Sequence, residues 1–235
     1  MPARGSETNA SRRHGQAERR RRFGLLLVSI SAVFAVEGIA EPGPWSQAIA
    51  SVLLAITVTL SLRVADARPE IMRPIAMITG ILTAVAIVAA VAGHGRGIAV
   101  AGSQLLLVAV APAATMIGTL RTLRLRNEVT TEAVFGVLCL YVLLGMLFAF
   151  LYAVIALLNG GALFTGHQVA TMANCLYYSF TTLTTVGYGD LTVASNLGHT
   201  LSVSEALVGQ IYLVTVVSLI VGNLGLRRRE PAGGR

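Results

Sequence analysis

The sequence Thr-Thr-Val-Gly-Tyr-Gly-Asp occupies residues 184–190. Its first six residues end a run of 57 residues, 133–189, that contains no Asp, Glu, Lys or Arg, and Asp190 follows that run directly. Threonine, valine and tyrosine favour an extended backbone, whereas the two glycines permit backbone conformations that are closed to other residues. A strand in which such residues alternate can turn successive carbonyl groups toward one side. We expect the rest of the chain to be arranged around this heptapeptide.

The composition of the 235-residue chain indicates a membrane protein, because 54% of the residues are hydrophobic and only 12% are charged. A soluble domain carries about a quarter charged residues, and a disordered chain is far less hydrophobic. Uncharged apolar stretches of about 20 residues are what a membrane-spanning helix needs. Five stretches have no charged residue: 42–62, 74–95, 97–120, 133–189 and 206–226. Since the basic residues lie between these stretches, the net charge of +7 indicates contact with a lipid bilayer and not with nucleic acid.

We expect an all-α integral membrane protein with six transmembrane helices, because backbone polar groups in lipid must be satisfied within the segment itself. The six predicted spans are Phe23–Ala40, Trp45–Leu62, Pro74–Ala92, Ile98–Leu120, Ala133–Leu158 and Thr200–Leu226.

The arginines predict the orientation. All eighteen basic residues are arginine, and in the six-span arrangement only Arg96 falls on the opposite side from the other seventeen. Positively charged loops face the cytoplasm, so we expect both termini there, in the inner membrane of a cell. The absence of lysine favours a bacterial source. A cleaved signal peptide is the alternative for the first span, but Glu37 adjoins the cleavage site and the apolar run is long enough to be retained.

A short apolar segment, Thr171–Thr182, precedes the heptapeptide. It is too short to cross the bilayer but long enough to enter it and stop midway. Irregular backbone at that depth is tolerated where it lines a water-filled path. A stack of carbonyl oxygens can replace the hydration shell of a monovalent cation, and the carbonyl end of the short helix favours a cation there.

These residues resemble the potassium-channel family. Thr-Val-Gly-Tyr-Gly at 185–189 is similar to its selectivity filter, and residues 177–185 are similar to its pore helix. Asp190 matches the acidic residue that closes the filter, and Gly209 lies where the family places a hinge glycine in its inner helix. The resemblance covers 133–226, and we call residues 184–190 the filter segment.

The resemblance implies roles for individual residues. The main-chain carbonyls of four residues are expected to coordinate K⁺: Thr185, Val186, Gly187 and Tyr188. Three further residues are expected to support them: Thr184, Gly189 and Asp190. One chain carries one filter segment, so we expect a homotetramer with cyclic symmetry. K⁺ is the permeant ion, no cofactor is implied, and without a nucleophile–base constellation we expect no enzyme activity.

The resemblance also divides the chain. We expect a disordered basic N-terminus over 1–22, a four-helix membrane domain over 23–120, a linker over 121–132, a pore domain over 133–226 and a cytoplasmic tail over 227–235. The four-helix domain resembles a voltage sensor in topology but lacks its charges, because Arg121, Arg124 and Arg126 lie only at the cytoplasmic end of the fourth span. We expect little voltage dependence.

Four residues on one face of the sixth span are candidates for gating: Gly209, Leu213, Val217 and Val221. Gly209 permits either bending or close packing against the pore helix. Leu213, Val217 and Val221 are apolar and fit a gate that closes by dewetting.

Glu205 is the only acid in the sixth span. An ionisable residue in a membrane helix is a functional hypothesis. Facing Thr181 or Thr182, Glu205 would be a proton sensor, since burial disfavours the charged form; otherwise it reaches the outer interface. Thr181 replaces a glutamate found in some family members, so Asp190 needs another partner or water.

The alternative functions are a non-selective cation channel and a non-conducting pore-like subunit.

Overall fold

The computed structural model describes residues 4–41, 43–66, 68–89, 92, 98–126, 131–166 and 168–227. Within these ranges the regular elements are helices, and the one β-bridge joins Phe164 to Val193. The helices are α1 (Arg4–Ile39), α2 (Pro44–Val64), α3 (Pro69–Ala89), α4 (Ile98–Arg126), α5 (Thr131–Leu158), α6 (Met172–Leu183) and α7 (Asn196–Arg227).

Five helices in the described part of the chain are long and apolar enough to cross a membrane, so the protein is a multi-pass, all-helical membrane protein. The qualifying stretches are Arg20–Ile39, Pro44–Val64, Met72–Ala89, Val100–Thr119 and Val134–Leu158. Each coincides with a predicted span. The sixth predicted span lies within α7, and its crossing of the membrane stays a prediction.

Two helix starts show why the boundaries fall where they do. Pro44 opens α2 after Gly43, and a proline is favoured at the first helical position because its missing N–H would have no partner there. α3 begins at Pro69 for the same reason, five residues before the predicted start at Pro74, which lies inside the helix. Pro74 is the first residue of the uncharged stretch, but α3 extends beyond its membrane-embedded part and begins earlier.

The N-terminal segment differs from the disorder expected for residues 1–22, because α1 begins at Arg4. A helix is costly to nucleate and cheap to extend, so the apolar span beyond Phe23 supplies the nucleus for the polar residues before it. Glu18 and Arg22, one helical turn apart, form an ion pair with 2.7 Å between Oε1 and Nη2, and this pair stabilises the polar part of the helix.

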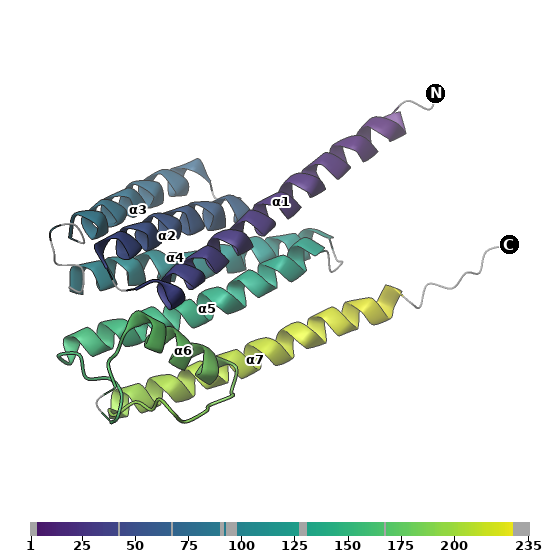
Figure 1. Ribbon diagram of the computed structural model, residues 1–235. Helices are drawn as coiled ribbons and strands as arrows, with labels where there is room; N and C mark the ends of the chain where they lie inside the picture. The colour runs from purple at the N-terminus through teal and green to yellow at the C-terminus, as the bar shows by residue number, and fades with distance from the viewer. Residues whose placement is uncertain are drawn as a thin grey trace.

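The helices form one bundle in which α5 lies between the first four helices and the C-terminal elements (Figure 1). α4 and α1 pack on α5, and α6 packs on both α5 and α7. α1 also contacts α6, through an edge-to-face pair of Phe34 and Phe180 with ring centroids 5.1 Å apart. The first helix therefore reaches the element that precedes the filter segment.

Glycines allow the closest helix approaches. A Cβ on Gly118 of α4 would lie 2.8 Å from the Val64 carbonyl oxygen of α2, and a Cβ on Gly145 of α5 would lie 2.7 Å from the Phe180 ring. Small residues let helix backbones approach in this way in membranes.

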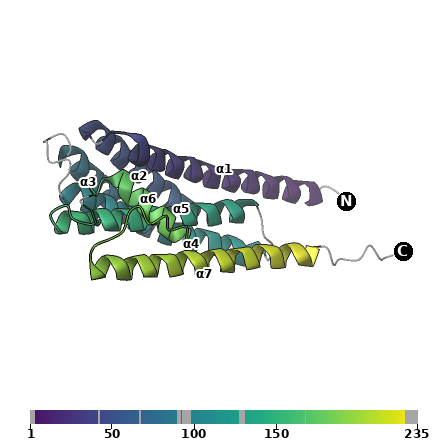
Figure 2. The same ribbon diagram turned by 60° about the horizontal axis from the view of Figure 1, so that its bottom comes forward.

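The two ends of the molecule differ. In Figures 1 and 2 the start of α1 and the end of α7 lie on the same side, and α6 with its flanking loops lies toward the other. This arrangement places the filter segment away from the end of α7 and from the start of α1, which carries seven of the eighteen arginines.

Candidate functional site

The short helix α6 positions the filter segment. Thr171 caps its start, since the Thr171 hydroxyl accepts a hydrogen bond from the Asn174 N–H at 3.1 Å. The helix ends at Leu183, one residue after the predicted end at Thr182. Its twelve residues are too few to cross a bilayer, so the chain must leave α6 partway.

The filter segment folds back onto the end of α6. The Thr181 carbonyl oxygen accepts hydrogen bonds from the N–H groups of Val186 at 2.9 Å and Gly187 at 3.1 Å. The Thr182 carbonyl oxygen accepts from the Thr185 N–H at 2.9 Å. These bonds satisfy carbonyls that a helix end leaves without a partner, and they direct three filter N–H groups toward the protein.

Alternate residues of the filter segment have positive φ: 59° at Thr185, +52° at Gly187 and +79° at Gly189. Glycine adopts this region freely, which explains the glycines at 187 and 189. A β-branched residue such as Thr185 is strained there. Strain of this kind concentrates at functional sites, where the surrounding structure holds it.

A tyrosine cluster supports the outer end of the filter segment. The Tyr177 hydroxyl donates a hydrogen bond to Asp190 Oδ2 at 2.8 Å, and this bond raises the pKa of Tyr177. The Tyr177 ring stacks on the Tyr188 ring, with centroids 6.2 Å apart and planes within 7°. Tyr177 is therefore the partner that Asp190 was expected to need. The sequence does not single out Tyr177, because Tyr178 stands next to it and is one residue closer to Asp190.

The loops on either side of α6 and the filter segment are tied together. The Thr165 N–H donates to the Thr192 carbonyl at 2.8 Å, and the Ala194 N–H donates to the Leu163 carbonyl at 2.9 Å. The two threonine hydroxyls are also 2.6 Å apart. This bridge closes a frame around the filter segment without a disulfide, and both described cysteines are free.

Glu205 lies in α7 and is fully buried, with 0% of its surface exposed. The Tyr152 hydroxyl of α5 donates to Glu205 Oε2 at 2.8 Å, and the Ser179 hydroxyl of α6 contacts Glu205 Oε1. Glu205 faces α6 as one of the two hypotheses expected, but its partner is Ser179 and not Thr181 or Thr182. The interface alternative is wrong, because the side chain does not reach the surface of the chain.

The gating candidates have different positions. Gly209 packs against the end of α6, where a Cβ would overlap with the Leu183 carbonyl oxygen and approach the Leu183 side chain. The close-packing hypothesis for Gly209 therefore holds, and bending at Gly209 stays a prediction. Leu213 is partly exposed on α7. The side chains of Val217 and Val221 lie outside the described residues.

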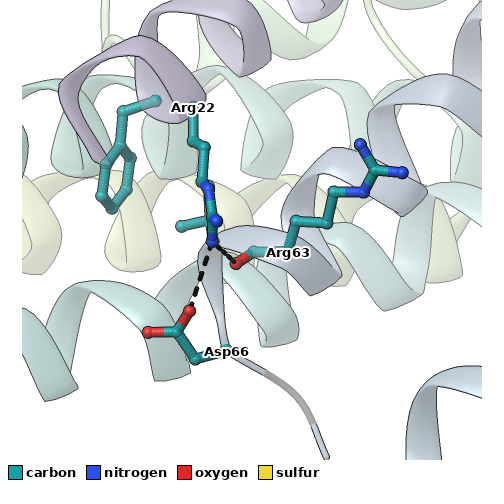
Figure 3. Close-up of a pocket in the computed structure, with 5 residues that line it drawn as sticks. Arg22, Arg63 and Asp66 are labelled. Atoms are coloured by element: carbon teal, nitrogen blue, oxygen red, sulfur yellow. Dashed lines mark hydrogen bonds and ion pairs between the residues drawn. The ribbon is translucent and has the colours of Figure 1, made fainter. Parts of the chain in front are cut away.

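A second polar cluster lies at the other side of the molecule, around a pocket lined by Arg22, Phe23, Arg63, Val64 and Asp66 (Figure 3). The Arg22 guanidinium contacts Asp66 Oδ1 and the Arg63 carbonyl oxygen, each at 3.4 Å. These contacts fix α1 to the end of α2. The side chains of Arg121, Arg124 and Arg126 lie outside the described residues.

A short helix, a backbone segment with alternating positive φ and two flanking long helices therefore lie together in a multi-pass membrane protein. Residues 136–224 match a family model described as "Ion channel". The match runs from α5 through α6 into α7, and it makes this part of the chain similar to ion channels. A search of curated proteins and of solved structures gave no match.

Proposed function

We propose that the protein is a potassium-selective channel in which four copies of the chain surround one pore. The observation that carries the proposal is the hydrogen bonding of the filter segment. Its N–H groups at 185–187 are tied to α6, whereas no hydrogen bond from another described residue reaches the carbonyl oxygens of 185–188. Backbone acceptors within a membrane need partners, and K⁺ ions that have shed water supply them.

The exposure of the filter segment supports assembly. In the single chain Val186 is 53% exposed and Tyr188 is 70% exposed. One chain has one such segment, and a ring of copies would enclose it with closed symmetry. The exposed apolar residues of α7, which include Val203, Leu207 and Ile211, are then available to neighbouring copies, the pore or lipid.

The arginines and the placement of the helix ends support an orientation in the membrane. The arginine-rich start of α1 and end of α7 lie on one side of the molecule, and positively charged segments face the cytoplasm. We assign that side to the cytoplasm of a bacterial inner membrane and the loops around α6 to the outside.

The four-helix unit is proposed to contribute little voltage dependence. The membrane-embedded part of α4 carries no charged residue between Ile98 and Leu120. Moving one charge across 100 mV supplies about 2.3 kcal/mol, so an α4 span without charges in the field has little work available from the membrane potential.

The deciding experiment is planar-bilayer recording of the purified protein with unequal K⁺ and Na⁺ on the two sides. A reversal potential close to the K⁺ equilibrium potential is the expected result. A reversal potential that ignores the K⁺ gradient would identify a non-selective cation channel. Absence of current and of liposome ion flux, with the protein shown to be inserted, would identify a non-conducting subunit.

A further inference from the structure

The buried carboxyl of Glu205 joins three helices of the pore module. It receives the Tyr152 hydroxyl of α5 on Oε2 and contacts the Ser179 hydroxyl of α6 through Oε1. Ser179 itself is fully buried, one and a half turns before the filter segment. A carboxyl group taken out of water needs either a proton or charged partners, so the hydrogens around it must be counted.

Ser179 has two oxygen neighbours and one hydroxyl hydrogen. Its Oγ lies 2.7 Å from the Gly145 carbonyl oxygen of α5, which can only accept a hydrogen bond. Its other neighbour is Glu205 Oε1. If Ser179 donates to Gly145, the contact between Ser179 and Glu205 needs a hydrogen from elsewhere.

The neighbouring hydroxyls cannot supply it. Ser202 Oγ donates to the Gly198 carbonyl at 2.8 Å, and the Tyr178 hydroxyl donates to Ser202 Oγ, 2.7 Å away. The Tyr152 hydrogen goes to Glu205 Oε2, which at 2.8 Å is closer than the alternative acceptor Ser202 Oγ at 3.2 Å. Every hydroxyl hydrogen of the cluster is then used, and the contact between Ser179 and Glu205 is still without one.

We propose that Glu205 carries the missing proton and donates it from Oε1 to Ser179 Oγ, so that a neutral carboxyl fastens α7 to α6 and positions the filter segment. With this proton, each of the five shortest contacts of the cluster has one hydrogen. Glu205 is a positioning residue here, because it acts on the filter through Ser179. Its effect on K⁺ conduction rests on the proposed function.

The surroundings of Glu205 favour the neutral form. The titratable side chains that face it from the packed helices are Tyr152 and Tyr141 of α5 and Tyr178 of α6, and tyrosine is uncharged at neutral pH. No arginine or lysine occurs in α5 after Glu132 or in α6. On the outer side, Asp190 and His199 are exposed, so they are the groups from which a pH effect of Glu205 must be separated.

Loss of the proton would change the attachment of α6. An ionised Glu205 could only accept hydrogen bonds, so Ser179 would have to release either Gly145 or Glu205. The two choices break one hydrogen bond from α6 to α5 or one contact from α6 to α7. Because α6 ends in the carbonyls that hold the filter N–H groups, either change would disturb the filter segment.

The first test is infrared difference spectroscopy of the full-length protein in lipid, wild type against Glu205→Gln. We expect a protonated-carboxyl C=O band at neutral pH that belongs to Glu205 and disappears on alkaline titration. A carboxylate signal from Glu205 at neutral pH would overturn the proposal. This measurement does not require the protein to conduct, so it is independent of the proposed function.

The second test is the pH dependence of K⁺ flux into liposomes. Wild-type flux should fall about fivefold as Glu205 ionises at alkaline pH, which is the factor that one hydrogen bond supplies. Glu205→Gln should keep, at every pH, the K⁺ flux that the wild type shows at acid pH, because the amide is a permanently neutral donor and acceptor. Ser179→Ala should lower the flux at every pH.

Ser204→Ala is the matched control for Ser179→Ala, since Ser204 is an exposed serine of α7 whose described hydrogen bond goes to the Thr200 carbonyl one turn earlier. It should keep the wild-type flux and pH profile. If Glu205→Gln keeps the wild-type profile, the pH response comes from another group such as His199, and the role of Glu205 is refuted. If wild type itself passes no K⁺, the proposed function fails and the infrared result alone decides the protonation.

Discussion

The four-helix unit α1–α4 and the module formed by α5, α6 and α7 bury polar groups in different ways. In the first unit, neutral side chains pair across helices: Thr57 with Ser29, Gln104 with Ser51 and Thr115 with Ser61, at 3.2 to 3.4 Å. In the second, a buried carboxyl group lies among four hydroxyls, of which the Ser202 hydroxyl is partly buried. The first arrangement holds helices together, whereas the second connects the helices that carry the filter segment.

Backbone geometry separates the two regions as well. Within the described residues, Asp66 is the one residue of α1–α4 and their connections with a positive φ, and it lies in a loop. The filter segment has three such residues in five positions. Thr185 is strained there, and the positive φ of Gly187 and Gly189 disfavours any side chain, so small changes in the filter segment should have far larger effects than small changes in the four-helix unit. The predictions below test that difference, from the largest expected effect to the smallest.

The largest effect is expected in the filter segment. Gly187→Ala places a Cβ on a residue with φ of +52°, and Tyr188→Ala removes the ring that stacks on Tyr177. We expect both variants to insert in the membrane and to lose K⁺ selectivity or conduction, measured as the reversal potential and current in bilayers.

Gly160→Ala is the matched control for Gly187→Ala. Gly160 also has a positive φ, +66°, and open space around its Cβ position, but it lies in the loop after α5. It should keep wild-type selectivity. Wild-type selectivity in both filter variants would refute the assignment of the filter segment.

The next effect concerns the approach of α7 to α6. Gly209→Ala would push a Cβ into the Leu183 carbonyl oxygen, and overpacking of this kind costs about 1–3 kcal/mol. We expect a lower midpoint of thermal unfolding in detergent and a lower open probability. Gly102→Ala in α4 is the control, because nothing lies within 4 Å of its Cβ position; it should be neutral or stabilising by up to about 1 kcal/mol. Equal destabilisation by both changes would contradict the difference between the two regions.

A smaller effect is expected at the outer end of the filter segment. Tyr177→Phe keeps the ring that stacks on Tyr188 but removes the hydroxyl that donates to Asp190. We expect K⁺ selectivity to remain and the current to decline faster during sustained recording, because Asp190 loses its described partner. Asp190→Ala, which removes the acceptor, should behave similarly. A current that is as stable as wild type in both variants would show that the hydrogen bond does not support the filter.

The four-helix unit should respond only in stability. Thr115→Val removes the hydroxyl that donates to Ser61, and both residues are fully buried. The net loss for one neutral hydrogen bond is about 0.5–1.5 kcal/mol, which thermal unfolding should detect. The reversal potential should not change; a change in selectivity would mean that α4 influences the filter segment more directly than its packing indicates.

The smallest effect is expected from membrane voltage. The conductance of the wild type should change little with voltage, since the span from Ile98 to Leu120 has no charge. Arg124→Gln should leave the conductance–voltage curve unchanged. A steep curve that Arg124→Gln flattens would place these arginines in the membrane field and refute the expectation.

Much of the fold follows from patterns that are local in the sequence. Span positions depend on runs of about 20 apolar residues, and all six predicted spans coincide with helices to within a few residues at most ends. The short helix was predicted as Thr171–Thr182 and is Met172–Leu183. The N-terminal helix was missed, because polar residues next to a span can continue a helix that they would not nucleate alone.

The candidate site divides in the same way. The filter segment is recognisable because two glycines must stand where the backbone has a positive φ, and that requirement lies within consecutive residues. Hydrogen-bond partners are not recognisable in this way. Tyr177 is 13 residues from Asp190, and Tyr152 is 53 residues from Glu205.

The sequence by itself therefore determined that the chain enters a membrane, where its helices lie, and which residues resemble the filter of the potassium-channel family, because hydropathy and short motifs are properties of neighbouring residues. Only the tertiary structure decided that Glu205 is buried between Tyr152 and Ser179, that Gly209 meets Leu183, and that Phe34 of the first helix touches Phe180. These contacts depend on the rotation of each helix about its axis and on how closely helices that are far apart in the chain approach one another. Apolar segments of similar composition do not specify that rotation, whereas small residues and buried polar groups do.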